Sequence, residues 1–386
     1  GCYGWEAALR FIEETGVDVL RQHERALCAR FLDGLADISG VRLVGPRNMD
    51  RRVGVISVDF LRRDNAEMAY ALEAQYGVVQ DYELQERVNR IGQSLVAVSD
   101  RQDLEYTFKV LNCDEVNALA CPGGFVYVFK GLIDYMPSDS ELAGVLGHEV
   151  SHIVEKHTVH QIEKQLLTTL LLAVATKGDM GLTGLASQAL AAGYSRTDER
   201  GADKEGFNLC VKAGYNPYSM VLTINKLEDL AKEKGNPGYG LFSSHPEPEE
   251  RLKRVMKQIK KLDPHPDITV HEDGTATVHE GDWTFNITQT VGNDKPEYRA
   301  YMLAGSLYVA RQRGPVDPYR FIVYDNGSSA TLYYEDVQLL TVYNQDAYAA
   351  GFGDAGSYAN GCAQLLREWA PVANANDAAK ADKDKD

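Results

Sequence analysis

The spacing of apolar residues changes along the chain, and each change marks a segment with a different expected structure. Residues 1–78 alternate between helical and extended patterns, which predicts an α/β segment. Its expected helices cover residues 6–15, 18–35 and 66–75, and its expected strand covers residues 53–60. Residues 79–263 have mainly helical periodicity with a pair of strands near the middle, which predicts a helical core with a small sheet.

The pattern alternates between apolar and polar residues over 264–370. Two such runs flank Asp273-Gly274, a typical hairpin signal. Further extended runs are expected over residues 283–288, 306–310, 320–324 and 331–334. Residues 371–386 end in alternating lysine and aspartate with little apolar surface, which predicts a disordered charged tail. The expected fold class is therefore α+β multidomain, with an N-terminal α/β fragment and a β-rich C-terminal region.

Apolar run length and net charge limit the possible partners. The longest apolar run, residues 166–176, is well short of the ~20 residues that span a bilayer, so we expect a buried helix and no membrane span. With 40 basic and 56 acidic residues, the chain has a net charge of −16. Such a surface repels nucleic acid and anionic membranes, so neither is expected as a partner.

Residues 148–152 have the sequence His-Glu-Val-Ser-His, an HExxH motif. Ser138 and Glu141 have the spacing of a capping box, so the motif is expected on a helix that begins close to them. Because residues four apart share one face of a helix, His148 and His152 are predicted to bind one metal ion. Glu149 lies about 100° around the helix, where it can reach a water molecule on the metal.

A catalytic zinc site needs a third protein ligand and one open position. A second helix is expected over residues 196–213, ending at Gly214. Glu199 and Asp203 lie four apart on one face of this helix. We predict that Glu199 binds zinc while Asp203 accepts a hydrogen bond from a ligand histidine, which would fix the ring's orientation.

These motifs resemble those of the M48 metallopeptidases, a group of gluzincins. The order and spacing over residues 79–263 match in VNALACPGGFVYVFKGLID, ELAGVLGHEVSHIVEKH, YSRTDERGADKEG, GYNP and SSHPEPEERL. The resemblance implies a zincin-type fold, one zinc ion per chain and Glu199 as the third ligand. It also implies that His245 enters the active site and stabilises the oxyanion, whereas the alternative for His245 is to cap the next helix.

The resemblance further implies a periplasmic or cell-envelope location and a role in envelope protein quality control. No basic-then-apolar signal pattern is visible near Gly1, so the location rests on the resemblance alone.

Two further histidines raise the question of a second metal. No carboxylate cluster follows His157 and His160 at ligand spacing, so both are expected to lie outside the ligand set, beside a ligand or at the surface.

The β-branched and aromatic residues that follow Gly123 and Gly124 predict a strand. Two adjacent glycines allow another backbone to approach closely. An exposed edge strand can bind a substrate backbone by strand addition. We therefore expect Gly123, Gly124, Phe125 and Val126 to contact the substrate, the alternative being an interior strand.

Residues 1–77 resemble the C-terminal subdomain of class V aminotransferases, especially cysteine desulfurases. The resemblance is carried by GWEAALRFIEETGVDVLRQHERALCARFLDGLADISGVRLVGP, RRVGVISVDF and AEMAYALEAQYGV. That family needs an imine-forming lysine upstream of this region and a loop cysteine just after Tyr76-Gly77-Val78, and both are missing. Without the lysine, pyridoxal phosphate has no covalent anchor, so we expect no chemistry from this segment.

The predicted function is that of a zinc-dependent metalloendopeptidase, which hydrolyses internal peptide bonds of unfolded or extended protein substrates. A first alternative is non-catalytic, chaperone-like binding of unfolded chains, which the intact Glu149 disfavours. A second alternative is a remnant pyridoxal-phosphate enzyme. Visible absorbance would detect its imine.

Overall fold

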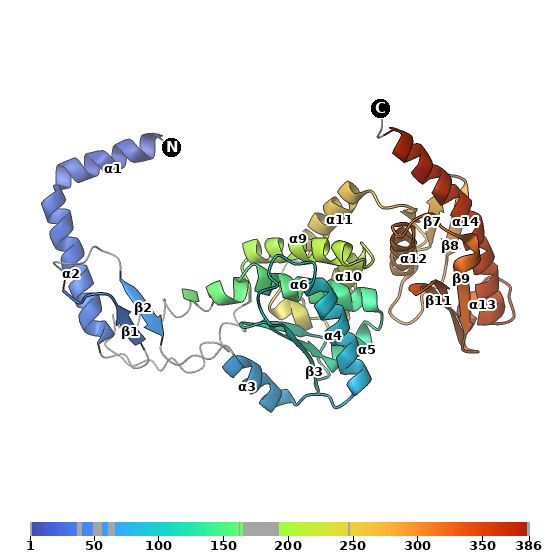
Figure 1. Ribbon diagram of the computed structural model, residues 1–386, viewed down its shortest axis with the longest axis horizontal. Coiled ribbons are helices and arrows are strands. Elements are labelled where there is room, and N and C mark those ends of the chain that lie inside the picture. Colours follow the sequence, from blue (N-terminus) through green and yellow to red (C-terminus); the bar gives the residue numbers. More distant parts are fainter. Residues whose placement is uncertain are drawn as a thin grey trace. The chain divides into compact units, whose positions relative to one another are not determined.

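The computed structural model describes residues 2–36, 41–48, 56–60, 66–161, 163–164, 193–245 and 248–383. Two compact units make up the chain (Figure 1): Gly1–Ala71 with Thr158–Ala192, and Leu72–His157 with Gly193–Asp386. The apolar run at 166–176 lies outside the described residues. Within the described ranges, none of the helices has the length and apolar character that crossing a bilayer requires.

The first unit confirms the helices expected near the N-terminus. It contains α1 (Cys2–Thr15), α2 (Val17–Leu35), β1 (Val41–Val44), β2 (Ser57–Phe60) and the first part of α3 (Ala66–Tyr76). The two strands pair antiparallel. Cys28, Leu32 and Leu35 are buried along one stripe of α2, as the helical spacing of its apolar residues predicts. Of the strand expected over 53–60, residues 57–60 form β2, and residues 53–55 lie outside the described residues.

The second unit begins with a small sheet among helices. Its elements up to residue 262 are α4 (Tyr82–Val96), β3 (Thr107–Leu111), β4 (Ala118–Cys121), β5 (Phe125–Phe129), α5 (Lys130–Tyr135), α6 (Asp139–Val154), α9 (Arg196–Lys212), α10 (Ser219–Glu233), η2 (Gly240–Ser243) and α11 (Pro248–Leu262). The sheet order is β3-β5-β4, with β5 parallel to β3 and antiparallel to β4. Apolar side chains of α4 and α6 form one buried core with those of this sheet. The predicted helical core with a small sheet is thus confirmed.

The strand expected to bind substrate lies in the wrong place for that role. Phe125 and Val126 belong to β5, which is paired on both sides, so this strand has no free edge for another backbone. Gly124 is needed for a different close approach. Its φ is 91°, and a Cβ there would lie 2.1 Å from the carbonyl oxygen of Glu105. The expectation of strand addition along Phe125 and Val126 is therefore wrong, whereas contact of Gly123 and Gly124 with the substrate stays a prediction.

The C-terminal region is a mixture of helices and strands, not the β-rich region that was expected. It consists of β6 (Asp267–Val270), β7 (Ala276–Glu280), β8 (Trp283–Ile287), α12 (Pro296–Arg311), η3 (Pro318–Arg320), β9 (Phe321–Asp325), β10 (Ser329–Tyr334), β11 (Val337–Tyr343), α13 (Asn344–Ala349) and α14 (Ala355–Lys383). The hairpin at Asp273-Gly274 is confirmed, because it joins β6 to β7. Residues 306–310, expected as a strand, lie inside α12. Because this helix is buried on most sides, it has apolar residues all around it and lacks the one-sided helical pattern.

The disordered tail expected over residues 371–386 is also incorrect for residues 371–383, which belong to α14, whereas residues 384–386 lie outside the described residues. Trp369 and Ala373 are buried on one face of this helix. Beyond them, Asn374 exchanges two hydrogen bonds with the backbone of Val316, and Asp377 accepts hydrogen bonds from Arg311. These contacts to distant parts of the chain order a segment whose composition alone predicts disorder.

The boundary expected at residue 263 does not separate two compact units. One buried apolar cluster contains Val221 of α10 and Val255 of α11 together with Val278 of β7 and Leu303 of α12. Residues 264–383 therefore pack into the same unit as the helices that precede them.

Candidate metal centre

The HExxH motif lies on α6, which begins at the predicted capping box. Ser138 accepts a hydrogen bond from the backbone N–H of Glu141, and the Glu141 carboxylate accepts one from the backbone N–H of Ser138. The helix α9 begins in the same way, with Ser195 and Asp198. Two well-defined helix starts fix which residues of α6 and α9 face each other.

The two helices cross at a pair of glycines. A Cβ on Gly206 of α9 would lie 3.0 Å from the carbonyl carbon of Gly147 and 3.0 Å from the backbone nitrogen of His148. Such a short approach is possible only without side chains at the crossing. It brings Glu199, on the first turns of α9, next to the histidines of α6.

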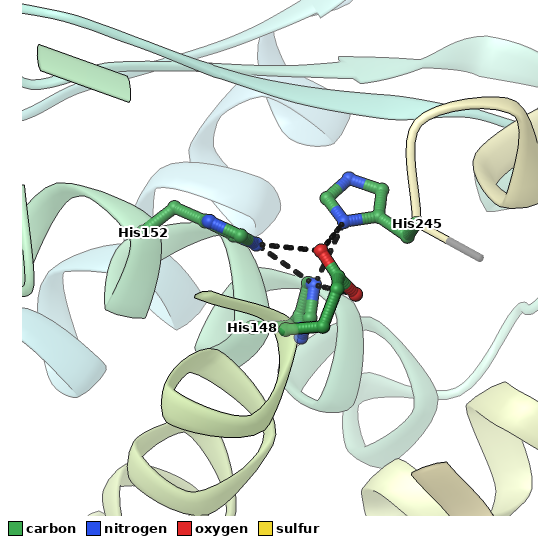
Figure 2. A group of neighbouring side chains, drawn as sticks. His148, His152 and His245 are labelled. Atoms are coloured by element: carbon green, nitrogen blue, oxygen red, sulfur yellow. Dashed lines mark hydrogen bonds and ion pairs between the residues drawn. The ribbon is translucent and has the colours of Figure 1, made fainter. Parts of the chain in front are cut away.

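Four side chains meet in the interior of the unit: His148, His152, Glu199 and His245 (Figure 2). One ligand atom from each lies within 4.8 Å of all the others. The Nε2 atoms of His148 and His152 are 3.1 Å apart. Oε1 of Glu199 lies 3.5 Å from His152 Nε2 and 2.8 Å from His245 Nδ1. All four are buried, and only His245 comes from outside α6 and α9.

The donor set of this cluster fits a bound cation. Three imidazole nitrogens and a carboxylate oxygen lie within 4.8 Å of one another. Imidazole and carboxylate ligands in this number are those of catalytic zinc sites. The structure thus brings together the three ligands expected from sequence.

Charge and burial prepare the ligands for a metal. Burial opposes the ionisation of Glu199, but the positive charges of His245, Arg251 and His148 together hold its pKa well below the usual range. Burial lowers the pKa of His152 well below its usual value, which favours the neutral imidazole that binds metals.

Glu149 lies beside this cluster and is completely buried. Neither of its carboxylate oxygens has a hydrogen-bond partner in the described part of the chain, and its Oε1 lies 3.4 Å from Nε2 of His245. A buried carboxylate in this state is ready to accept a hydrogen bond from a bound water or substrate.

Arg251 is a member of the site that the sequence interpretation missed. It lies on α11, with its Nη2 2.8 Å from Oδ1 of Asp203 and its Nη1 3.3 Å from Oε2 of Glu199. Asp203 also lies 3.2 Å from Nδ1 of His148, the contact that was predicted for it. Burial works against the charge of Asp203, but Arg251 and His148 lower its pKa to about 2.

A signal for Arg251 was present in the sequence. Arg251, Val255 and Ile259 follow one another at intervals of four, and all three are buried on the same face of α11. An arginine on an apolar stripe of a helix indicates a buried ion pair. The lysines of α11 make this signal hard to recognise, because a helix so rich in lysine has the composition of a solvated surface helix.

Tyr194 was missed as well, and no sequence signal identifies it. Its ring stacks on that of His152, with the ring centroids 3.7 Å apart. His157 is buried next to His152, whereas His160 is exposed. Among the described residues no second cluster of metal ligands is found.

Comparison with known proteins finds that two family models match parts of the chain. The model described as Peptidase family M48 matches residues 83–259. The model described as Aminotransferase class-V matches residues 1–80. Both resemblances inferred from the sequence motifs are thus confirmed, and the metal cluster falls within the first segment.

Three relatives illustrate the likeness. The β-barrel assembly-enhancing protease of Yersinia pestis is 30% identical over 209 residues, which are 50% of this chain and 43% of that protein. The mitochondrial metalloendopeptidase OMA1 of Schizosaccharomyces pombe is 26% identical over 243 residues, 61% of this chain and 70% of that protein. The metalloprotease YcaL of Escherichia coli is 32% identical over 164 residues, 39% of this chain and 61% of that protein. The chain spans less than half the length of the assembly-enhancing protease that it matches.

Proposed function

Because residues 83–259 belong to peptidase family M48, we propose that this chain is a zinc-dependent metalloendopeptidase that hydrolyses internal peptide bonds of proteins. The observation that carries the proposal is the buried cluster of His148, His152 and Glu199 beside the unpartnered carboxylate of Glu149. We assign one zinc ion per chain to this cluster.

Each group has a defined part in the proposed reaction. Zinc, when bound, polarises the scissile carbonyl and makes water more acidic. Glu149 accepts the proton of the attacking water and passes it to the leaving amine. Its burial favours this role, because no hydrogen bond from the described residues competes for either oxygen. Asp203 and Arg251 hold His148 and Glu199 in place through the contacts described above.

His245 has two possible roles that differ in their chemistry. As a fourth protein ligand it would fill the position that a catalytic site keeps open. We propose instead that it donates a hydrogen bond to the oxyanion, since its Nε2 faces Glu149 across 3.4 Å. Such a donor contributes roughly 2.7–4 kcal/mol to transition-state stabilisation. In that case His245→Ala retains zinc and loses most of its activity, whereas loss of a ligand would weaken zinc binding.

We propose that the substrate is an extended or unfolded protein segment, which binds so that a peptide bond lies near Glu149.

We further propose a role in protein quality control of the cell envelope. Its support is that several relatives are named β-barrel assembly-enhancing proteases. Binding of unfolded chains without cleavage is the alternative, and an intact Glu149 argues against it as the sole role. A pyridoxal-phosphate enzyme is the second alternative, which a visible absorbance band of the imine would reveal.

The test compares Glu149→Gln and Glu199→Ala with wild type. A glutamine side chain is nearly isosteric with glutamate but cannot accept the proton, so Glu149→Gln is expected to retain zinc while proteolysis falls roughly 10²–10⁴-fold. Glu199→Ala is expected to lose zinc. Zinc is measured by elemental analysis, and activity by cleavage of unfolded casein.

Two results would contradict the proposal. Cleavage by Glu149→Gln near the wild-type rate would require another base. Unchanged zinc content in Glu199→Ala would place the third ligand elsewhere.

A further inference from the structure

His157 has no part in the ligand set, yet it contacts one of the ligands. We propose that His157 is a positioning residue that fixes the tautomer and ring orientation of His152, so that Nε2 of His152 faces the metal. The proposal rests on the proposed function, because it concerns zinc bound at this site.

The contact joins the far side of the ligand ring to His157. Nδ1 of His157 lies 3.2 Å from Nδ1 of His152, and the two rings meet edge to face at 72°. The other nitrogen of His152, Nε2, lies 3.1 Å from Nε2 of His148 inside the cluster. Each nitrogen of His152 therefore has a different neighbour, one in the cluster and one outside it.

The positions of the protons follow from this arrangement. To bind a metal, Nε2 of His152 must carry a lone pair, so its proton is on Nδ1 and is donated to His157. Nδ1 of His157 must then be the acceptor, which places its own proton on Nε2. That nitrogen lies 3.8 Å from Oδ1 of Asp198, a carboxylate that favours a proton on this side. One set of tautomers is thus consistent with the positions of Asp198, His157 and His152.

The surrounding backbone makes room for this ring. Lys156, between α6 and His157, has a φ of 60°, a left-handed conformation that residues other than glycine rarely adopt. The next residue, His157, contacts His152. On α9, Gly201 faces the ring, and a Cβ there would lie 3.2 Å from Cε1 of His157. Both features accommodate an imidazole beside His152.

The two histidine ligands are therefore oriented by different groups. Nδ1 of His148 faces the carboxylate of Asp203 at 3.2 Å. Nδ1 of His152 faces an imidazole, which is an acceptor only as one tautomer. Hydrogen-bond partners of metal-binding histidines affect metal affinity strongly, by roughly 10–100-fold when they are removed.

The experiment measures the zinc dissociation constant of the full chain by competition with a chromogenic chelator. His157→Leu replaces the imidazole with an apolar side chain of similar length and so removes the acceptor nitrogen Nδ1. We expect its zinc affinity to fall roughly 10–100-fold. His157→Asn has an amide oxygen near the position of Nδ1, so it is expected to recover part of that loss. His160→Leu, at an exposed position three residues away, is the matched control and is expected to bind as wild type.

The comparison of the two His157 variants separates positioning from packing. Equal losses in His157→Leu and His157→Asn would overturn the proposal, because packing alone would then explain them. Wild-type affinity in His157→Leu would overturn it too. If circular dichroism shows that His157→Leu does not fold, the folded variant His157→Asn decides alone. Wild-type zinc affinity or a full hundredfold loss of affinity in His157→Asn would then overturn the proposal. A wild-type chain that binds no zinc would overturn the proposed function and, with it, this proposal. Zinc binding that is the same in wild type and in His157→Leu would overturn this proposal alone.

Discussion

Replacing Gly206 with alanine tests whether the close crossing of α6 and α9 holds the metal ligands together. The new Cβ would lie 3.0 Å from two backbone atoms of α6, those of Gly147 and His148 described above. Backbone atoms inside a helix cannot rotate away as a side chain can. The helices must therefore separate by a few tenths of an ångström, which moves Glu199 away from the histidines of α6.

Two effects of opposite sign set the expected change in stability. Overpacking a close contact costs roughly 1–3 kcal/mol. Alanine is better than glycine inside a helix by about 1 kcal/mol. The free energy of unfolding of Gly206→Ala is thus expected to fall by roughly 0–2 kcal/mol.

The matched control is Gly361→Ala in α14. A Cβ there would have only the ring of Phe352 nearby, at 3.3 Å, and that ring is 39% exposed and can move. The control is therefore expected to gain up to about 1 kcal/mol. The two variants should differ by roughly 1–3 kcal/mol, although both make the same chemical change.

The assay combines denaturant unfolding of the zinc-free proteins with zinc competition by a chelator. Gly206→Ala is expected to unfold at lower denaturant than Gly361→Ala and to bind zinc more weakly, whereas the control binds as wild type. If Gly206→Ala is stabilised as much as the control and its zinc affinity is unchanged, the crossing does not position the ligands.

Two more predictions concern the interactions of two carboxylates, Glu73 and Asp139. Removing residues 1–65 keeps Glu73, which accepts hydrogen bonds from a lysine of β3 and a tyrosine of β5, so zinc binding and cleavage are expected to persist. Removing residues 1–76 also removes the carboxylate of Glu73, and the loss of its two hydrogen bonds is expected to lower the stability to unfolding by roughly 1–3 kcal/mol; equal thermal unfolding of the two truncated chains would contradict this. Burial opposes the ionisation of Asp139, but two arginines of α4 lower its pKa. The ionised carboxylate therefore stabilises the fold at a pH above the usual carboxyl pKa of about 4. This stabilisation is lost as the pH falls through the lowered pKa of Asp139. Asp139→Asn is thus expected to unfold at lower denaturant than wild type at neutral pH, with a gap that narrows in acid; a gap independent of pH would refute it.

Several features of the site could be predicted because they depend on residues close together in the sequence. The spacing of His148 and His152 places them on one face whenever the segment is helical, and the capping box at Ser138 starts that helix. The same holds for Glu199 and Asp203 on α9 and for the hairpin at Asp273-Gly274. Local hydrogen bonds and helical geometry are enough to fix these relations.

The place of His245 could not be derived in this way. It is about a hundred residues from His148, and only the resemblance to a family brought it into the predicted site. Its position in the cluster depends on how the chain between α10 and α11 packs. Arg251 follows it on α11, and its role appears only when that helix meets α9.

The errors have the same cause. Whether a strand is central or terminal depends on its partners, and β5 is central because β3 and β4, which are separate segments, pair with its two sides. The end of α14 is helical because Trp369 and Ala373 are buried and Asp377 meets Arg311, 66 residues earlier in the chain. The sequence by itself determined the chemistry of the metal ligands and the helices that carry them. Only the tertiary structure decided strand order, the helical tail and the buried arginine, because each depends on burial and pairing between residues far apart in the chain.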